Sequence, residues 1–290
     1  MFIASTVVLN TLQVEAFRNA ERAAHPEYDE MLPSVVDGHL TQALSDFAVN
    51  QPFAYEAMQA ADLITIRGPY VTIAVVVGIL FFVFLFAKLP RTMTHDHPLT
   101  MQELKETSAS LIRNARYREG VVAQAFYVGA QIMVWTFVIH YGMTVIGLTA
   151  AESQGYNIVA MMIFLSSRFI CTFILGYIMP GPLLILLAAG GILMTLGTIF
   201  LPGYAGFYSL LGISACMSLM FPTIYAIALK DMGDEASLAS AGLVMAIVGG
   251  ALMPPIQGAL IDAGPIIGDL PSIRTSFLLP LVCFFVVATY

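Results

Sequence analysis

The sequence is poor in charge and in cysteine. Lys, Arg, Asp and Glu make up 11% of the 290 residues, whereas 58% are hydrophobic, and the mean hydropathy is +0.82. This composition excludes an ordinary soluble protein, and repeated uncharged runs of membrane-spanning length predict a multi-pass membrane protein instead of a secreted chain with one signal sequence. The three cysteines, Cys171, Cys216 and Cys283, all lie in apolar runs. We therefore expect no disulfide framework, no metal site and no cofactor.

Acidic residues are absent from every membrane-length stretch, although Arg168 lies inside one. A guanidinium at membrane depth costs between ~2.5 and ~17 kcal/mol depending on the reference state, so such residues usually face a bundle interior or a water-filled path. Two interpretations of Arg168 stay open. It is either a structural cation bonded to backbone carbonyls or lipid phosphate, or part of a polar translocation site whose acidic counterpart is not among these residues.

The pattern does not favour an enzyme. Intramembrane catalysis would need paired acids, a Ser–His pair or metal ligands at membrane depth. His140 is the one histidine inside a predicted span, and nine residues separate it from Gln131, which places the two on opposite sides of a helix. We expect transport or a structural role, and no binding of nucleic acid.

Seven membrane spans and one fragment are predicted. The fragment covers about 1–14 and reads as the end of a helix that begins before residue 1. An acid-rich segment, 15–67, follows it, and we expect short amphipathic helices there. The stretch 182–229 carries no charge before Lys230 and is too long for one crossing, so the turn at 201–206 divides it into two spans. The other predicted spans are 69–87, 120–148, about 155–178, about 238–261, and 275–290.

Basic residues predict the orientation. Six of the twelve Lys and Arg residues lie in the connector 88–118, which should therefore be cytoplasmic. One basic connector followed by six spans is typical of the second half of a twelve-helix transporter, which predicts an all-α polytopic bundle in the cell membrane (the inner membrane if Gram-negative). The predicted parts are the end of a truncated helix five at 1–14, a non-cytoplasmic loop at 15–67, helix six at 68–88, a cytoplasmic central loop at 89–118, and a C-terminal six-helix half at 119–290, with helices one to four missing.

A polar and aromatic stripe runs along the span 120–148. Its members are spaced by three, four and four residues and fall within about 80° of one another on a helix: Gln124, Tyr127, Gln131 and Trp135. Amides can bind sugar hydroxyls, and a flat ring can cover the apolar face of a sugar, so we interpret the stripe as a sugar site near the bilayer midplane. The alternative is helix–helix hydrogen bonding, at ~0.6–2 kcal/mol per contact.

Two further stripes accompany it. One carries Asn157, Met161, Phe164 and Arg168, and the other carries Ser214, Ser218, Phe221 and Tyr225. Pro222 lies within the second stripe and predicts a flexible point, because proline frees a backbone carbonyl. The serines could instead serve close packing or back-bonding, and Tyr225 could be a gate or an interface anchor. The full set of candidate substrate-binding residues is Gln131, Trp135, Tyr127, Gln124, Asn157, Arg168 and Tyr225.

Four segments of the chain resemble a known family. They are QAFYVGAQIMVWTFVIHY (124–141), SSRFICTFI (166–174), CMSLMFPTIYAIALKDMG (216–233) and LVMAIVGGALMPPIQG (243–258). These segments are similar to the L-fucose/proton symporter family of the major facilitator superfamily. The resemblance implies a partial major facilitator fold, from the end of helix five through helix twelve, and symport of fucose or a related hexose with a proton by alternating access.

The same resemblance implies the partners. They are a hexose, a proton, the lipid bilayer and the missing N-terminal half, whose helices one and four carry the proton-binding acids in this family. A major facilitator exporter of drugs or organic anions is the alternative, because Arg168 could hold an anion. The amide and Trp stripe fits a neutral polyol better.

Overall fold

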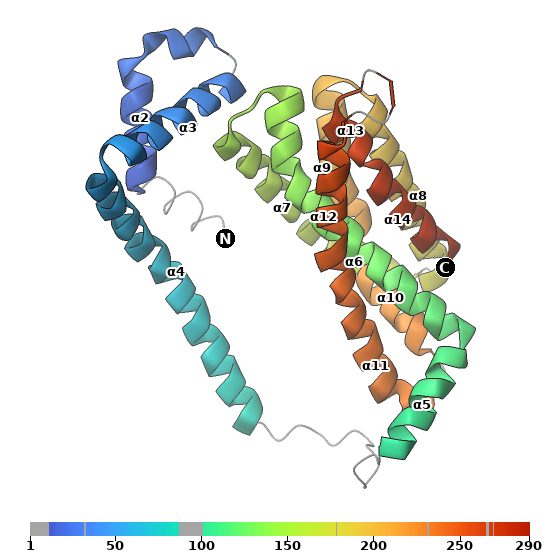
Figure 1. Cartoon of the computed structure of the whole chain (residues 1–290). Helices are drawn as coiled ribbons and strands as arrows, with labels where there is room; N and C mark the ends of the chain where they lie inside the picture. The colour runs from blue at the N-terminus through green and yellow to red at the C-terminus, as the bar shows by residue number, and fades with distance from the viewer. Residues whose placement is uncertain are drawn as a thin grey trace. The chain divides into compact units, whose positions relative to one another are not determined.

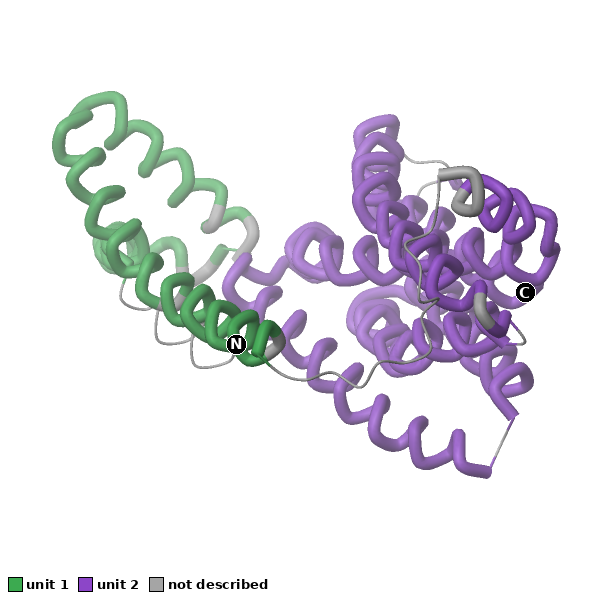
Figure 2. The backbone as a smooth tube through the Cα atoms, turned by 90° about the horizontal axis from the view of Figure 1, so that it is seen from below, with its two compact units in different colours: residues 1–92 green, residues 93–290 purple. Residues whose placement is uncertain are grey.

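The computed structural model describes residues 12–31, 33–86, 101–177, 179–230, 232–264, 267–268 and 270–290. Every regular element among them is a helix, which confirms the all-α prediction. The chain divides into two compact units, Met1–Thr92 and Met93–Tyr290 (Figure 2). Residues 1–11 of the predicted fragment 1–14, residue 87 of the predicted span 69–87, and residues 88–100 of the predicted connector 88–118 lie outside the described residues.

The first unit is built from α2 (Gln13–Ala24), η1 (Pro26–Glu30), α3 (Pro33–Asn50) and α4 (Pro52–Phe86) (Figure 1). Phe17 of α2 packs on Phe47 of α3, with 4.9 Å between the ring centroids. The buried Asp62 of α4 accepts hydrogen bonds from the backbone N–H groups of Gln13 and Val14, at 2.6 and 3.1 Å. A helix start has N–H groups without intrahelical partners, so this carboxylate caps α2 and ties it to α4.

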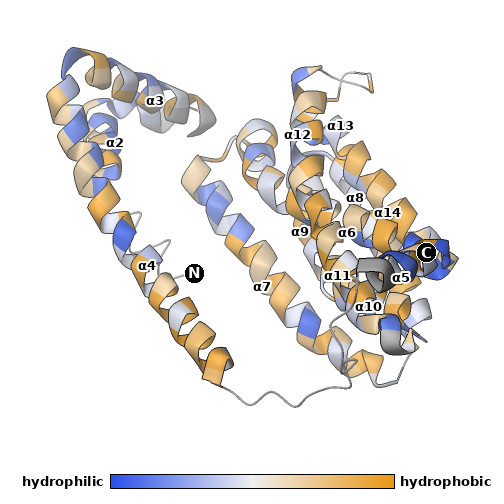
Figure 3. Cartoon of the chain, turned by 60° about the horizontal axis from the view of Figure 1, so that its bottom comes forward, coloured by the Kyte–Doolittle hydropathy of each residue, from blue (hydrophilic) through white to orange (hydrophobic). Residues whose placement is uncertain are grey.

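Helix α4 is much longer than a membrane crossing requires. Its 35 residues span about 52 Å at 1.5 Å per residue, against a hydrocarbon core of ~30 Å. Residues 69–86 of the predicted crossing at 69–87 form its second half, which is almost wholly apolar (Figure 3). Large apolar side chains such as Val75 and Phe82 are exposed on it, as expected of a helix that faces lipid.

Six further helical segments long and apolar enough to cross a membrane lie in the described part of the second unit, which agrees with the seven spans predicted from the sequence. Four of these segments are interrupted: α6 ends in a π-helical turn, α9 and α10 are separated by a short turn, a 3-10 turn separates α11 from α12, and Phe277 separates α13 from α14. The elements are α5 (Met101–Arg113), α6 (Ala115–Tyr141), η2 (Gly142–Ile146), α7 (Ala150–Leu175), α8 (Pro180–Phe200), α9 (Gly203–Met217), α10 (Met220–Leu229), η3 (Gly233–Glu235), α11 (Ala236–Met245), η4 (Ala246–Val248), α12 (Gly249–Asp262), α13 (Ser272–Ser276) and α14 (Leu278–Thr289).

Local sequence signals fix the helix starts. The side chain of Asn114 accepts a hydrogen bond from the N–H of Tyr117 and caps α6. Thr149 and Glu152 form a capping box at the start of α7, in which each side chain bonds the other's backbone N–H. Pro180 opens α8, where its missing N–H removes no helical bond.

Helix α6 is central to the second unit and packs against α7, α10, α12 and α14. Its buried aromatic residues organise the core. The ring of Tyr141 lies 5.9 Å from Phe207 and 6.0 Å from Phe277, measured between centroids, and its hydroxyl donates to the carbonyl of Thr198. These contacts hold the end of α6 against α8, α9 and the junction between α13 and α14, where Phe277 lies.

The backbones of α6 and α12 approach each other closely at Gly249. A Cβ atom at this position would overlap the backbone carbonyl of Ala125, which cannot move as a flexible side chain can. We expect Gly249→Ala to lower the free energy of unfolding by about 1–3 kcal/mol, as overpacking usually does. The measurement is the thermal unfolding midpoint of the purified chain in detergent. Gly258→Ala is the matched control, because no atom lies within 4 Å of a Cβ built at Gly258 of the same helix. An equal midpoint for both variants would contradict the close approach.

Candidate functional site

The span formed by α9 and α10 is broken at Ser218 and Leu219. Pro222, four residues after Ser218, has no N–H, so it cannot bond the Ser218 carbonyl as a helical residue would. That carbonyl accepts a hydrogen bond from Nε of Arg168 on α7, at 3.2 Å. The carbonyl of Met217 accepts one from the hydroxyl of Tyr127 on α6, at 2.8 Å. Two of the predicted site residues are therefore bonded to the backbone of the break.

These bonds bear on the two interpretations of Arg168. The structure shows the bond to a backbone carbonyl that the structural interpretation requires. The guanidinium is nevertheless exposed, and among the described residues its terminal nitrogens make no hydrogen bond. Tyr127 differs, because its ring is wholly buried and its hydroxyl is occupied by Met217.

A three-residue cluster joins α6 to α7. The rings of Trp135 and Phe164 meet edge to face, 5.1 Å apart between centroids and at 84°. The guanidinium carbon of Arg168 lies 5.1 Å from the centroid of the Phe164 ring, within cation–π range. The indole nitrogen of Trp135 lies 3.4 Å from the hydroxyl of Ser214 on α9. The structure thus brings Trp135 and Arg168 to the same place through Phe164.

A second aromatic row joins α6 to α10. The ring of Tyr127 meets Phe221 edge to face at 6.2 Å, and Phe221 stacks on Tyr225 at 6.4 Å with 12° between the ring planes. Tyr225 is half-buried. It therefore continues the row that begins at the break, and no contact connects it directly with the Trp135 cluster.

The three predicted amides differ in accessibility. Gln131 is half-buried on α6, one turn from Trp135. Gln124 is wholly buried, and neither atom of its amide has a hydrogen-bond partner among the described residues. Asn157 on α7 is 6% exposed, and its Oδ1 is also unpaired. A buried polar group is usually hydrogen-bonded, so Gln124 and Asn157 have hydrogen-bonding capacity that the described residues leave unused. Gln131 is the amide best placed to meet a small molecule.

Sequence reasoning missed the polar contacts that Gln257 of α12 and Arg274 of α13 make. Gln257 donates from its amide to the hydroxyl of Ser276, and the buried Arg274 donates to the carbonyl of Leu201 at the end of α8. A cation at a helix C-terminus is favourable, so Arg274 fastens α13 to α8. Arg274 is a visible cation just before the apolar run that begins at Phe277, but its partner, a backbone carbonyl, has no sequence signature.

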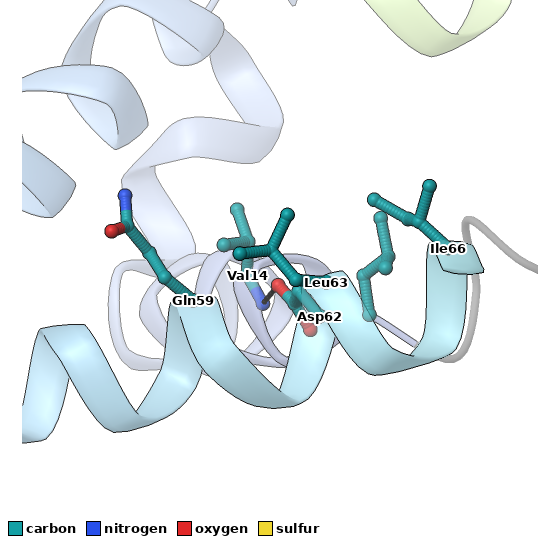
Figure 4. Close-up of a pocket in the computed structure, with 6 residues that line it drawn as sticks. Val14, Gln59, Asp62, Leu63 and Ile66 are labelled. Carbon is teal, nitrogen blue, oxygen red and sulfur yellow. Dashed lines mark hydrogen bonds between the residues drawn. The ribbon is translucent and has the colours of Figure 1, made fainter.

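The first unit has a shallow depression of about 390 Å³ (Figure 4). Asp62 is its one charged side chain, and both of its oxygens already accept backbone N–H groups. Among the described residues no three His, Cys, Asp or Glu side chains gather as a metal site requires. The depression therefore offers no acid–base chemistry of its own. Its lining residues are Leu12, Val14, Gln59, Asp62, Leu63 and Ile66.

Comparisons with known proteins agree with this architecture. The chain is 48% identical over 234 residues to an L-fucose-proton symporter of Haemophilus influenzae, a match that covers 81% of this chain and 54% of the relative. It is 33% identical over 239 residues to a glucose/galactose transporter of Brucella abortus, covering 82% of this chain and 55% of the relative. The crystal structure of FucP, a major facilitator superfamily transporter in the outward conformation, superposes with a TM-score of 0.72 at 27% identity, covering 84% of this chain and 58% of FucP. No protein-family model matches the chain.

The chain spans about half the length of the curated relatives that it matches. The apolar membrane-length helices and the symporter relatives together make it a multi-pass protein of the cell membrane. In sequence and in fold, the chain therefore belongs with the L-fucose/proton symporter family of the major facilitator superfamily, matching the C-terminal portion of its members.

Proposed function

We propose that this chain supplies the C-terminal half of a proton-coupled sugar symporter that works by alternating access. The observation that carries the proposal is the cluster of Trp135, Phe164 and Arg168 beside the half-buried Gln131. It presents an indole ring, amide donors and acceptors, and unused guanidinium donors at one place on α6 and α7. Relatives named for L-fucose and for glucose/galactose support a hexose as the substrate.

The chemistry of the cluster fits a neutral sugar. The Gln131 amide can both donate to and accept from hydroxyl groups, whereas a guanidinium only donates. The Trp135 ring offers a flat apolar surface, and Phe164 and Ser214 hold this ring in one orientation. A fixed ring and a fixed cation bind with less loss of side-chain freedom than mobile groups would. Gln124 and Tyr127 are wholly buried and Asn157 is buried in this conformation, whereas Tyr225 is half-buried, so a direct role of these four residues in binding stays part of the proposal.

Proton coupling is assigned to another part of the transporter. The sequence between Ser153 and Lys230 contains no Asp or Glu, and neither does the stretch between Gly120 and Ala151. A carboxylate that carries the proton must therefore come from outside these spans. We propose that it comes from a second helix bundle that faces α6 and α7, which the resemblance places in an N-terminal half.

An exporter of drugs or organic anions is the second candidate. The exposed guanidinium of Arg168 favours it, because the described helices place no carboxylate beside this cation. One donor of the cation is already bonded to the Ser218 carbonyl, however, and the amide of Gln131 and the ring of Trp135 can bind an uncharged ligand.

Relatives named as transporters also support the proposal that the protein is not an enzyme.

Substrate protection at Gln131 tests the proposal. The complete transporter is prepared without its native cysteines in this part, Cys171, Cys216 and Cys283, and carries Gln131→Cys. Because Gln131 is half-buried, a maleimide should reach the new thiol, and L-fucose, glucose or galactose should slow the labelling at least about threefold when most sites are occupied.

His140→Cys is the matched control for this labelling. His140 is exposed and lies on the opposite side of the same helix, so no sugar should protect it. Protection of Gln131→Cys by an organic anion, and by none of the sugars, would favour the exporter. Equal labelling with and without every ligand would remove Gln131 from the site.

A further inference from the structure

The break between α9 and α10 has an unusual backbone. Leu219 has φ −115° and ψ −1°, in the sparsely populated bridge region. The N–H of Ser218 reaches back to the carbonyl of Ala215, and regular helical bonding begins again where the N–H of Thr223 bonds Leu219. The helix therefore stops and restarts within a few residues, which leaves carbonyls at the end of α9 in need of other partners.

Two side chains from different helices supply those partners. Tyr127 of α6 donates to Met217, the last residue of α9, and Arg168 of α7 donates to Ser218. The hydroxyl of Ser218 also contacts the sulfur of Cys171, at 3.8 Å. The Ser218 carbonyl is the one that Pro222 would bond if it had an N–H, so Arg168 stands in for a missing backbone donor.

The segment after the break is the part that these bonds would restrain. Helix α10 carries Phe221 and Tyr225, whose rings stack, and Phe221 also contacts the ring of Tyr127. A change of the backbone angles at Leu219 would turn α10, and both rings with it, relative to α9. Helices in alternating-access proteins bend at such interrupted points.

We propose that Arg168 and Tyr127 lock a hinge between α9 and α10, and that the Arg168 bond compensates for the N–H absent from Pro222. Both residues are positioning residues in this role, because they act on the backbone of the break. The lock does not depend on the identity of the substrate. It therefore stands or fails separately from the proposed sugar transport.

Hydrogen exchange of the backbone amides at 219–225 tests the lock in the purified 290-residue chain. Arg168→Met keeps a long side chain but has no N–H donor, so it removes one hydrogen bond at the hinge and should speed this exchange about threefold to tenfold. Pro222→Ala provides an N–H for the Ser218 carbonyl, so in that background Arg168→Met should change the exchange by less than about twofold. The amides at 188–199 of α8 serve as the internal reference and should not change.

Pro222→Ala could also reduce exchange by stabilising α10 in general, and Tyr127→Phe, which removes one hydroxyl, distinguishes this effect from the lock. Its acceptor is the Met217 carbonyl, which the new N–H at residue 222 does not bond. Tyr127→Phe should therefore speed exchange at 219–225 in both backgrounds. If Arg168→Met does not yield folded protein, Arg168→Leu also lacks a donor and should show the same pattern. Equal effects of the Arg168 substitution in both backgrounds, or rescue of Tyr127→Phe by Pro222→Ala, would overturn the proposal.

Discussion

Replacing Gln131 by Ala in the complete transporter is expected to weaken sugar binding about tenfold to hundredfold. The substitution would leave one or two bound hydroxyls without partners, at a cost of about 1–3 kcal/mol, and each 1.4 kcal/mol is a factor of ten in affinity. Gln131 is half-buried on α6 and makes no hydrogen bond within the described part of the chain, so its loss should disturb the fold little. The expected effect is therefore on binding and not on stability.

Calorimetric titration of the purified variants with L-fucose, glucose and galactose measures this effect. His140→Ala is the control, because it shortens an exposed side chain on the opposite side of the same helix. We expect its affinity to stay within about twofold of the parent protein, less than the loss of a single hydrogen bond typically gives. If Gln131→Ala and His140→Ala cause equal, small changes, the stripe on α6 serves helix packing and the sugar lies elsewhere.

The 290-residue chain by itself is expected to accumulate no sugar in vesicles. It spans 54% of the Haemophilus influenzae symporter that it resembles, and its predicted binding surface includes the exposed Arg168. Alternating access needs two bundles that rock about a site between them, and one bundle cannot close such a site. No acidic residue lies within its spans between Gly120 and Lys230 except Glu152, which is occupied in the capping box of α7. The expected loss of transport is complete.

The architecture was largely predictable because membrane spans have a strong signal. A helix in lipid must bond its own backbone and cover about 20 residues with apolar side chains, so the composition of the chain already defines the crossings. The division of 182–229 at its turn is an example, since α8 ends at Phe200 and α9 begins at Gly203. The length of α4 was not predictable in the same way. Its first half, from Pro52, is polar enough to read as a loop, and its contact with α2 through Asp62 depends on the tertiary fold.

The sequence predicts which candidate site residues share one side of a helix. It does not predict which residues of different helices are in contact. Helical periodicity puts Gln131 and Trp135 on one side of α6, and their role in binding stays a prediction. It could not show that Phe164 lies between Trp135 and Arg168, because this contact depends on how α6 and α7 cross.

The partner of Arg168 illustrates the same limit. The sequence allowed a backbone carbonyl as that partner, and Pro222 indicated which carbonyl would be free. Only the packing of α7 on α9 joins the two. Every residue has a backbone carbonyl. The sequence therefore contains no motif that identifies which carbonyl accepts a hydrogen bond from a side chain on another helix.

Sugar uptake into vesicles driven by an imposed pH gradient tests the central claim most directly. The complete transporter and the 290-residue chain are reconstituted in parallel, with radiolabelled L-fucose, glucose or galactose outside and an acidic exterior. The account predicts that the complete transporter accumulates one of these sugars, that a protonophore abolishes the accumulation, and that the 290-residue chain shows none. Proton-driven accumulation by the 290-residue chain alone, or indifference of the complete transporter to both the sugars and the pH gradient, would contradict it.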